Sequence, residues 1–132
     1  MSATFVRILT AVLFFLFIFA LGFWLSRSGK PYNIIIFTIH KLIAMGAIVY
    51  LAVTVHKVSQ VSPLDSAQII AIIITLLCFL TTILTGGLVS LARPMPPIVT
   101  SLHHLGPWLA VLSTVVSLYL FRSTNAGIIG FN

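Results

Sequence analysis

The chain has 132 residues, of which 60% are apolar and only 6% are charged, and its mean hydropathy is +1.22. Soluble domains carry roughly 25% charged and about 45–50% apolar residues, and a soluble chain this short could not bury so much apolar surface. The composition excludes a soluble enzyme and a free nucleic-acid-binding protein. It predicts a membrane protein whose net charge of +6 meets anionic lipid headgroups or an anionic cofactor.

Four apolar windows are each long enough for a transmembrane helix, which needs about 20 residues. They cover residues 8–25, 34–55, 67–91 and 98–120. Before the third window, Ser62 is predicted to be the N-cap, with Pro63 at the first helical position and Asp65 in the first turn. Because the connections are short, consecutive helices should run antiparallel. We expect an all-α, single-domain, up-down-up-down four-helix bundle over residues 1–132.

The first window also has the pattern of a signal peptide, with small residues near its end, and we expect it to be retained as a helix. Face A denotes the membrane side at which the first and third helices end. Four cations lie near face A and three near the opposite side: Arg27, Lys30, Lys41 and Arg93 against Arg7, Lys57 and Arg122. This near balance leaves the orientation open. The expected location is a multi-pass position in a prokaryotic-type inner membrane.

An internal repeat relates the second and fourth windows. Residues 30–42 align with residues 93–105 at an offset of 63 without a gap, with identical Pro, Ile, His and Leu positions. Both segments enter the membrane from face A, so the sequence predicts a pseudo-two-fold repeat of two helical hairpins. His40 and His103 become equivalent positions, each about 10 Å into the bundle.

Two histidines at one depth indicate a cofactor. Intramembrane histidines are costly and usually functional, and a flat macrocycle needs one axial ligand on each side. Histidine is a common axial ligand of haem iron. We therefore predict one haem b per chain, with His40 and His103 as the metal ligands. Only one of two adjacent residues can point at the axis, and the repeat selects His103. His104 would then lie beside a haem propionate or a neighbouring helix.

Glycines and cations surround the predicted site. Gly86 and Gly87 fall at the depth of the histidines, with Gly22 as a weaker counterpart, and would let a porphyrin approach the backbone; close helix packing is the other interpretation. Four cations are expected either to bind the propionates or to extend toward headgroups: Arg27, Lys30, Lys41 and Arg93. His56 has no matching histidine and is expected to form an interfacial pair with Lys57.

The four spans, with His40 and His103 in Thr-Ile-His-Lys-Leu and Ser-Leu-His-His-Leu, resemble the four-helix membrane b-type cytochromes. That group includes the cytochrome b561-like and superoxide oxidase-like proteins. The resemblance implies electron transfer through haem b, linked to a quinone or quinol pool or to other subunits of a redox complex. The chain departs from the di-haem members in offering one matched histidine pair. The resemblance therefore favours an electron-transfer protein over a stand-alone enzyme. If the chain is an enzyme, the resemblance implies a quinol-linked oxidoreductase.

Two other interpretations stay open. The chain could be a cofactor-free structural or assembly subunit of a larger membrane complex, in which the histidines bond each other, backbone carbonyls or lipid. It could also be a small transporter that uses the histidines as proton sites. A visible haem spectrum would distinguish the cytochrome from both of these alternatives.

Overall fold

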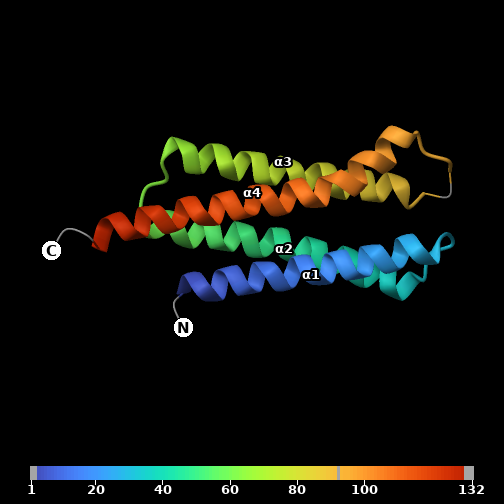
Figure 1. Cartoon of the computed structure of the whole chain (residues 1–132), viewed down its shortest axis with the longest axis horizontal. Helices are drawn as coiled ribbons and strands as arrows, with labels where there is room; N and C mark the ends of the chain where they lie inside the picture. The colour runs from blue at the N-terminus through green and yellow to red at the C-terminus, as the bar shows by residue number, and fades with distance from the viewer. Residues whose placement is uncertain (1–2, 92, 130–132) are drawn as a thin grey trace. The chain divides into compact units, whose positions relative to one another are not determined.

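The structure, a computed structural model, describes residues 3–91 and 93–129, with side chains for 5–91 and 93–121. The described residues form four helices and no strand: α1 (Ala3–Ser28), α2 (Ile34–Val61), α3 (Ser66–Val89) and α4 (Pro97–Ile129) (Figure 1). Each helix is long and apolar enough to cross a membrane. The predictions of an all-α protein and of four apolar spans are confirmed at this level.

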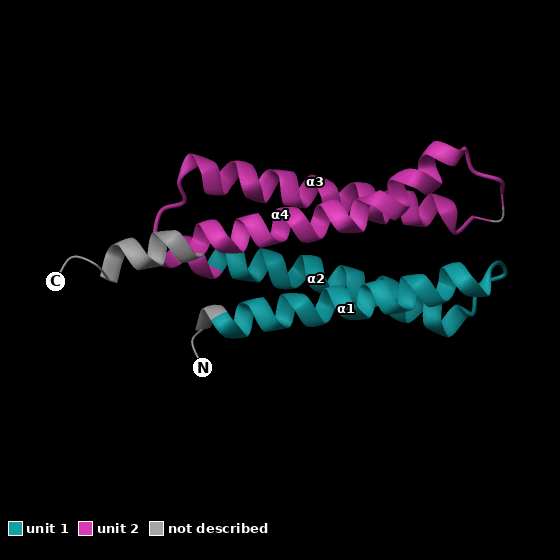
Figure 2. Cartoon of the chain, in the orientation of Figure 1, with its two compact units in different colours: residues 1–56 teal, residues 57–132 magenta. Residues whose placement is uncertain are grey.

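The chain divides into two compact units, residues 1–56 and 57–132 (Figure 2). The first unit contains α1 and most of α2, and the second contains α3 and α4. Each unit is a helical hairpin with its own contacts. The two hairpins are described one at a time.

In the first unit, α1 and α2 run antiparallel. The Tyr50 hydroxyl of α2 donates a hydrogen bond of 3.4 Å to the Arg7 carbonyl near the start of α1, and the Tyr50 and Phe14 rings lie 5.7 Å apart. At the turn, Gly29 has a φ of 69°, a left-handed conformation that glycine adopts easily after a helix. Asn33 then caps α2, because its Oδ1 accepts from the amide of Ile35 at 3.0 Å.

In the second unit, small and polar residues allow α3 and α4 to approach closely. The buried residues of α3 recur every three to six positions: Gln68, Ala71, Thr75, Phe79 and Thr85. On α4 the most buried side chains are Ala110, Thr114, Ser117 and Phe121. The hydroxyls of Thr75 and Ser117 are hydrogen-bonded across the interface at 3.1 Å. This seam fixes the register of α3 against α4.

The start of α3 differs from the prediction. Asp65, and not Ser62, is the N-cap. The helix α3 begins at Ser66, so Pro63 lies in the loop before it. The Asp65 carboxylate accepts from the Gln68 amide at 2.8 Å, and the Gln68 side chain accepts from the Asp65 amide at 3.0 Å. This reciprocal pair satisfies two backbone donors that a Ser62 cap would leave open.

Replacing the cap tests this assignment. Asp65→Ala is expected to lower the free energy of unfolding by about 1 kcal/mol, because the backbone amide of Gln68 in the first turn of α3 loses its carboxylate acceptor. Ser62→Ala should have a much smaller effect. Unfolding in mixed detergent micelles, followed by circular dichroism, measures both variants. A larger loss in Ser62→Ala would place the cap at Ser62 after all.

Candidate functional site

His40 and His103 occupy the same position in their helices. Each is the seventh residue, of α2 and of α4 respectively. With a rise of 1.5 Å per residue, both lie about 9 Å along the axis from the start of the helix. The two histidines are thus equally far from the starts of their own helices.

In the first unit, the ring of His40 packs against Gly22 of α1. A Cβ atom at Gly22 would lie 3.2 Å from Cε1 of His40 and 3.8 Å from its Nδ1. The side chain of His40 is half-buried, and its Nδ1 is shielded from solvent. The absence of a side chain at Gly22 therefore makes room for the histidine ring on the neighbouring helix.

In the second unit, the ring of His103 packs in the same way against Gly86 of α3. A Cβ atom at Gly86 would lie 2.7 Å from Cε1 of His103 and 3.1 Å from its Nδ1. The same Nδ1 lies 3.1 Å from the Thr82 carbonyl and 3.5 Å from the Thr85 hydroxyl. A carbonyl only accepts hydrogen bonds, so a hydrogen bond between these two atoms requires the proton on Nδ1.

Gly86 and Gly87 have different surroundings in the structure, although the sequence analysis gives them the same role. The His103 ring occupies the space beside Gly86, whereas a Cβ at Gly87 would meet nothing within 4 Å. Gly86 therefore accommodates a side chain of its own hairpin. Gly87 alone of the two keeps the open space that a porphyrin edge would need, and its contact with a cofactor stays a prediction.

Sequence reasoning missed two residues that support this cluster, Thr82 and Gly106. The Thr82 hydroxyl donates to the Cys78 carbonyl at 2.7 Å, and a Cβ at Gly106 would collide with that hydroxyl. Thr82 is thus fixed on both sides, and its carbonyl holds His103. The available signal was the spacing of Thr82, Thr85 and Gly86, which places all three on one face of a helix.

The other two histidines lie outside these contacts. His104 is exposed, with its ring 6.4 Å from that of His103 and inclined by 73°. His56 and Lys57 are both exposed near the end of α2. The sequence prediction that His103, rather than His104, is the equivalent of His40 agrees with the glycine contacts that His40 and His103 share.

Three of the four predicted propionate-binding cations lie over aromatic rings of the first unit. The distances to the ring centroids are 5.1 Å for Arg27 over Phe23, 6.0 Å for Lys30 over Tyr32 and 4.2 Å for Lys41 over Phe37. Arg93 in the second unit is exposed. Such contacts support long cationic side chains at a membrane interface while the charge stays accessible to anions. Their binding of propionates stays a prediction.

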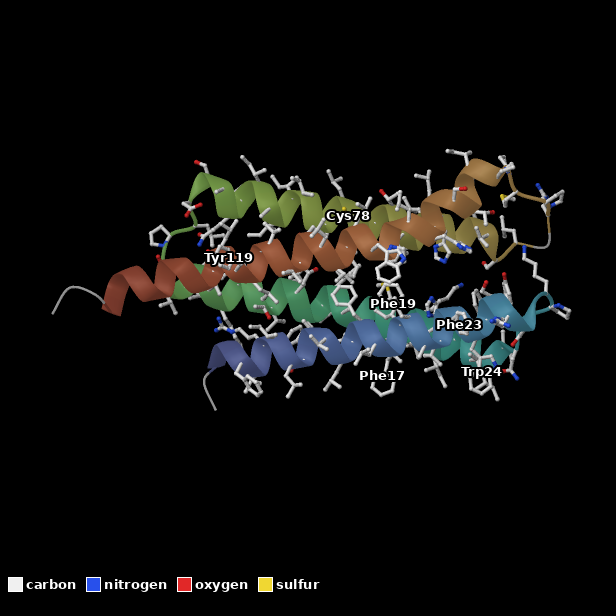
Figure 3. The ribbon with its side chains drawn as sticks, viewed as in Figure 1. Phe17, Phe19, Phe23, Trp24, Cys78 and Tyr119 are labelled. Atoms are coloured by element: carbon white, nitrogen blue, oxygen red, sulfur yellow. The ribbon has the colours of Figure 1, made fainter. Side chains whose placement is uncertain are left out.

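The outer surface of α1 suits lipid. Phe17 and Trp24 project outward from α1 (Figure 3), and 57% and 60% of their surfaces are exposed. Aromatic rings of this kind are typical of helices that contact acyl chains and the interface.

Comparisons with known proteins add no relative. No protein-family model, no curated protein and no solved structure matches the chain. Within the residues that the structure describes, no group of three or more His, Cys, Asp or Glu is placed to hold a metal ion. Each hairpin thus contains one histidine that packs on a glycine, His40 in the first and His103 in the second.

Proposed function

We propose that the chain is a membrane b-type cytochrome that holds one haem b between His40 and His103 and transfers single electrons. One observation carries the proposal. In each hairpin, a histidine at the seventh position of the second helix packs its ring on a glycine of the first helix. A single packing histidine needs no such counterpart in the other hairpin, whereas two axial ligands do.

The chemistry of the donor set fits a haem. Imidazole nitrogen is a common axial ligand of haem iron, and a ligating histidine usually donates its other N–H to a carbonyl or carboxylate. His103 has this arrangement, with Nδ1–H bonded to the Thr82 carbonyl at 3.1 Å. Its Nε2 is therefore in the protonation state that a metal requires.

The proposed assembly joins the hairpins by a pseudo-two-fold axis along the membrane normal, as an up-down-up-down bundle. Both histidines then lie at one depth from face A, in a prokaryotic inner membrane. The propionates would meet the cations at that face: Arg27, Lys30, Lys41 and Arg93. Cation–carboxylate hydrogen bonds at the membrane edge are strong and orienting.

Held by His40 and His103, a haem b would supply reversible one-electron transfer. The protein's part is to fix the two rings, to surround them with apolar residues and to neutralise the propionates. The electron donor of the proposed cytochrome is a membrane quinol, and its acceptor is a redox partner at face A. Other subunits of a redox complex are further proposed partners.

A second candidate function follows from the same hydrogen bond. His103 satisfies its polar ring within its own hairpin, as a packing residue of a cofactor-free structural or assembly subunit would. That candidate explains His103 alone. It gives no reason for the matching arrangement of His40 and Gly22.

A reduced-minus-oxidised absorption spectrum tests the proposal. Protein purified from cells that are supplied with a haem precursor is expected to show the bands of a low-spin b-type haem. A membrane quinol should reduce the haem in part and dithionite should reduce it fully. If dithionite reduces the haem but no quinol does, the proposal of a cytochrome would stand and the proposal of a quinol donor would be refuted. A protein that stays colourless would favour the structural subunit.

A further inference from the structure

We propose that Gly86 and the Thr82 carbonyl act together as a positioning device, which holds His103 as the Nδ1–H tautomer and makes Nε2 its metal-binding nitrogen. The metal part rests on the proposed function. The tautomer is a property of the haem-free chain. Gly86 is in this account a positioning residue for His103 and not a contact of the cofactor.

The tautomer follows from the partners of Nδ1. The Thr82 carbonyl, 3.1 Å away, has no proton to give. The Thr85 hydroxyl, 3.5 Å away, already donates to the Thr81 carbonyl at 2.7 Å. Both neighbours therefore present lone pairs to Nδ1. The neutral ring gains from placing its proton there, and Nε2 is left unprotonated.

The position of the ring depends on Gly86. A Cβ atom there would approach Cε1, Nδ1 and Nε2 of His103 to 2.7, 3.1 and 3.5 Å. Contacts shorter than 3 Å between carbon atoms are repulsive, so a methyl group would push the ring away from α3. The bond to the Thr82 carbonyl lengthens with that shift, and the preference for the Nδ1–H tautomer declines.

The acceptor itself cannot follow the displaced ring. Thr82 is held by the hydrogen bond from its hydroxyl to the Cys78 carbonyl, and Gly106 of α4 packs against the same hydroxyl. The carbonyl belongs to the backbone of a helix, which moves only as a rigid element. The substitution of Gly86 should therefore act on the tautomer of His103 and leave α3 in place.

Nitrogen NMR on the haem-free chain in detergent, labelled with ¹⁵N at histidine, measures the tautomer directly. The His103 signals are assigned by their loss in His103→Gln. We expect a protonated Nδ1 and an unprotonated Nε2 in the wild type, and a mixture of tautomers in Gly86→Ala. Gly87→Ala is the matched variant, since its methyl group meets nothing within 4 Å, and should keep the wild-type His103 signals.

The wild-type spectrum alone can overturn the inference, even if Gly86→Ala does not fold. A protonated Nε2 on His103 in the wild type would refute it. Identical His103 signals in folded Gly86→Ala and in the wild type would also refute it. A mixture of tautomers in both glycine variants would assign the effect to α3 as a whole and contradict the specific role of Gly86.

A haem titration separates this inference from the proposed function. If both hold, Gly86→Ala should bind haem about 10–100-fold more weakly than the wild type, as is typical for loss of an outer partner of a metal ligand. If the wild type binds no haem, the proposed cytochrome is refuted. The NMR result alone then decides whether His103 is held as the Nδ1–H tautomer. Tight binding by Gly86→Ala, equal to that of the wild type, would refute the positioning role.

Discussion

His40→Ala and His103→Ala are each expected to abolish stable haem binding. Each substitution removes one of the two proposed haem ligands, and no other histidine of its hairpin shares the packing on a glycine that positions the original ring. With only one of the two proposed ligands left, the chain is expected to lose the haem during purification in detergent. Haem content per purified chain, compared with that of the wild type, measures the effect, and we expect a loss of nearly all haem in both variants.

The matched control is His56→Ala, which removes an exposed histidine of the same helix as His40. It should keep one haem per chain. Loss of the haem in this variant would contradict the assignment of His40 and His103 as its two ligands. His104→Ala distinguishes the neighbours on α4: haem retained there and lost in His103→Ala assigns the ligand to His103, and the opposite result assigns it to His104.

Gly106→Ala is expected to lower the free energy of unfolding substantially. The new methyl group would occupy the place of the Thr82 hydroxyl, so α3 and α4 must separate or Thr82 must leave its rotamer. Overpacking of this kind costs about 1–3 kcal/mol, and the gain in helix propensity from glycine to alanine offsets at most about 1 kcal/mol of it. Unfolding in mixed detergent micelles measures the difference.

A second substitution identifies the cause. Thr82→Ala removes the colliding hydroxyl and keeps the backbone carbonyl that binds His103. The double variant Gly106→Ala with Thr82→Ala should therefore recover most of the lost stability, which appears as a coupling energy in a double-mutant cycle. Additive losses in the double variant would show that the two residues do not meet. Gly87→Ala, with open space beside it, should not destabilise the chain.

The sequence predicted the helices well because the signal is collective. About 20 apolar residues between breaks define a span whatever their order, and all four spans appear in the structure. The start of α3 was predicted wrongly because the cap depends on one reciprocal pair. The sequence offers both Ser62 and Asp65, and only the position of Gln68, three residues after Asp65, decides between them.

The helix positions of the two histidines were predictable from the sequence, and their contacts were not. The repeat identified His40 and His103 as equivalent, and both prove to be the seventh residue of a helix. The sequence could not divide the roles of Gly86 and Gly87, because that difference depends on which side of α3 faces α4. It also missed Thr82, because the spacing with Thr85 and Gly86 indicates a shared helix face and does not show that the Thr82 carbonyl binds a side chain.

The most direct test of the central claim is a count of haem per chain, by pyridine haemochrome assay on the purified protein after haem has been supplied during expression. The account predicts one b-type haem per chain, because the chain provides one pair of histidines in matching positions. Two haems per chain would contradict the single site and require a ligand partner for His56. No haem would contradict the cytochrome and favour a structural subunit.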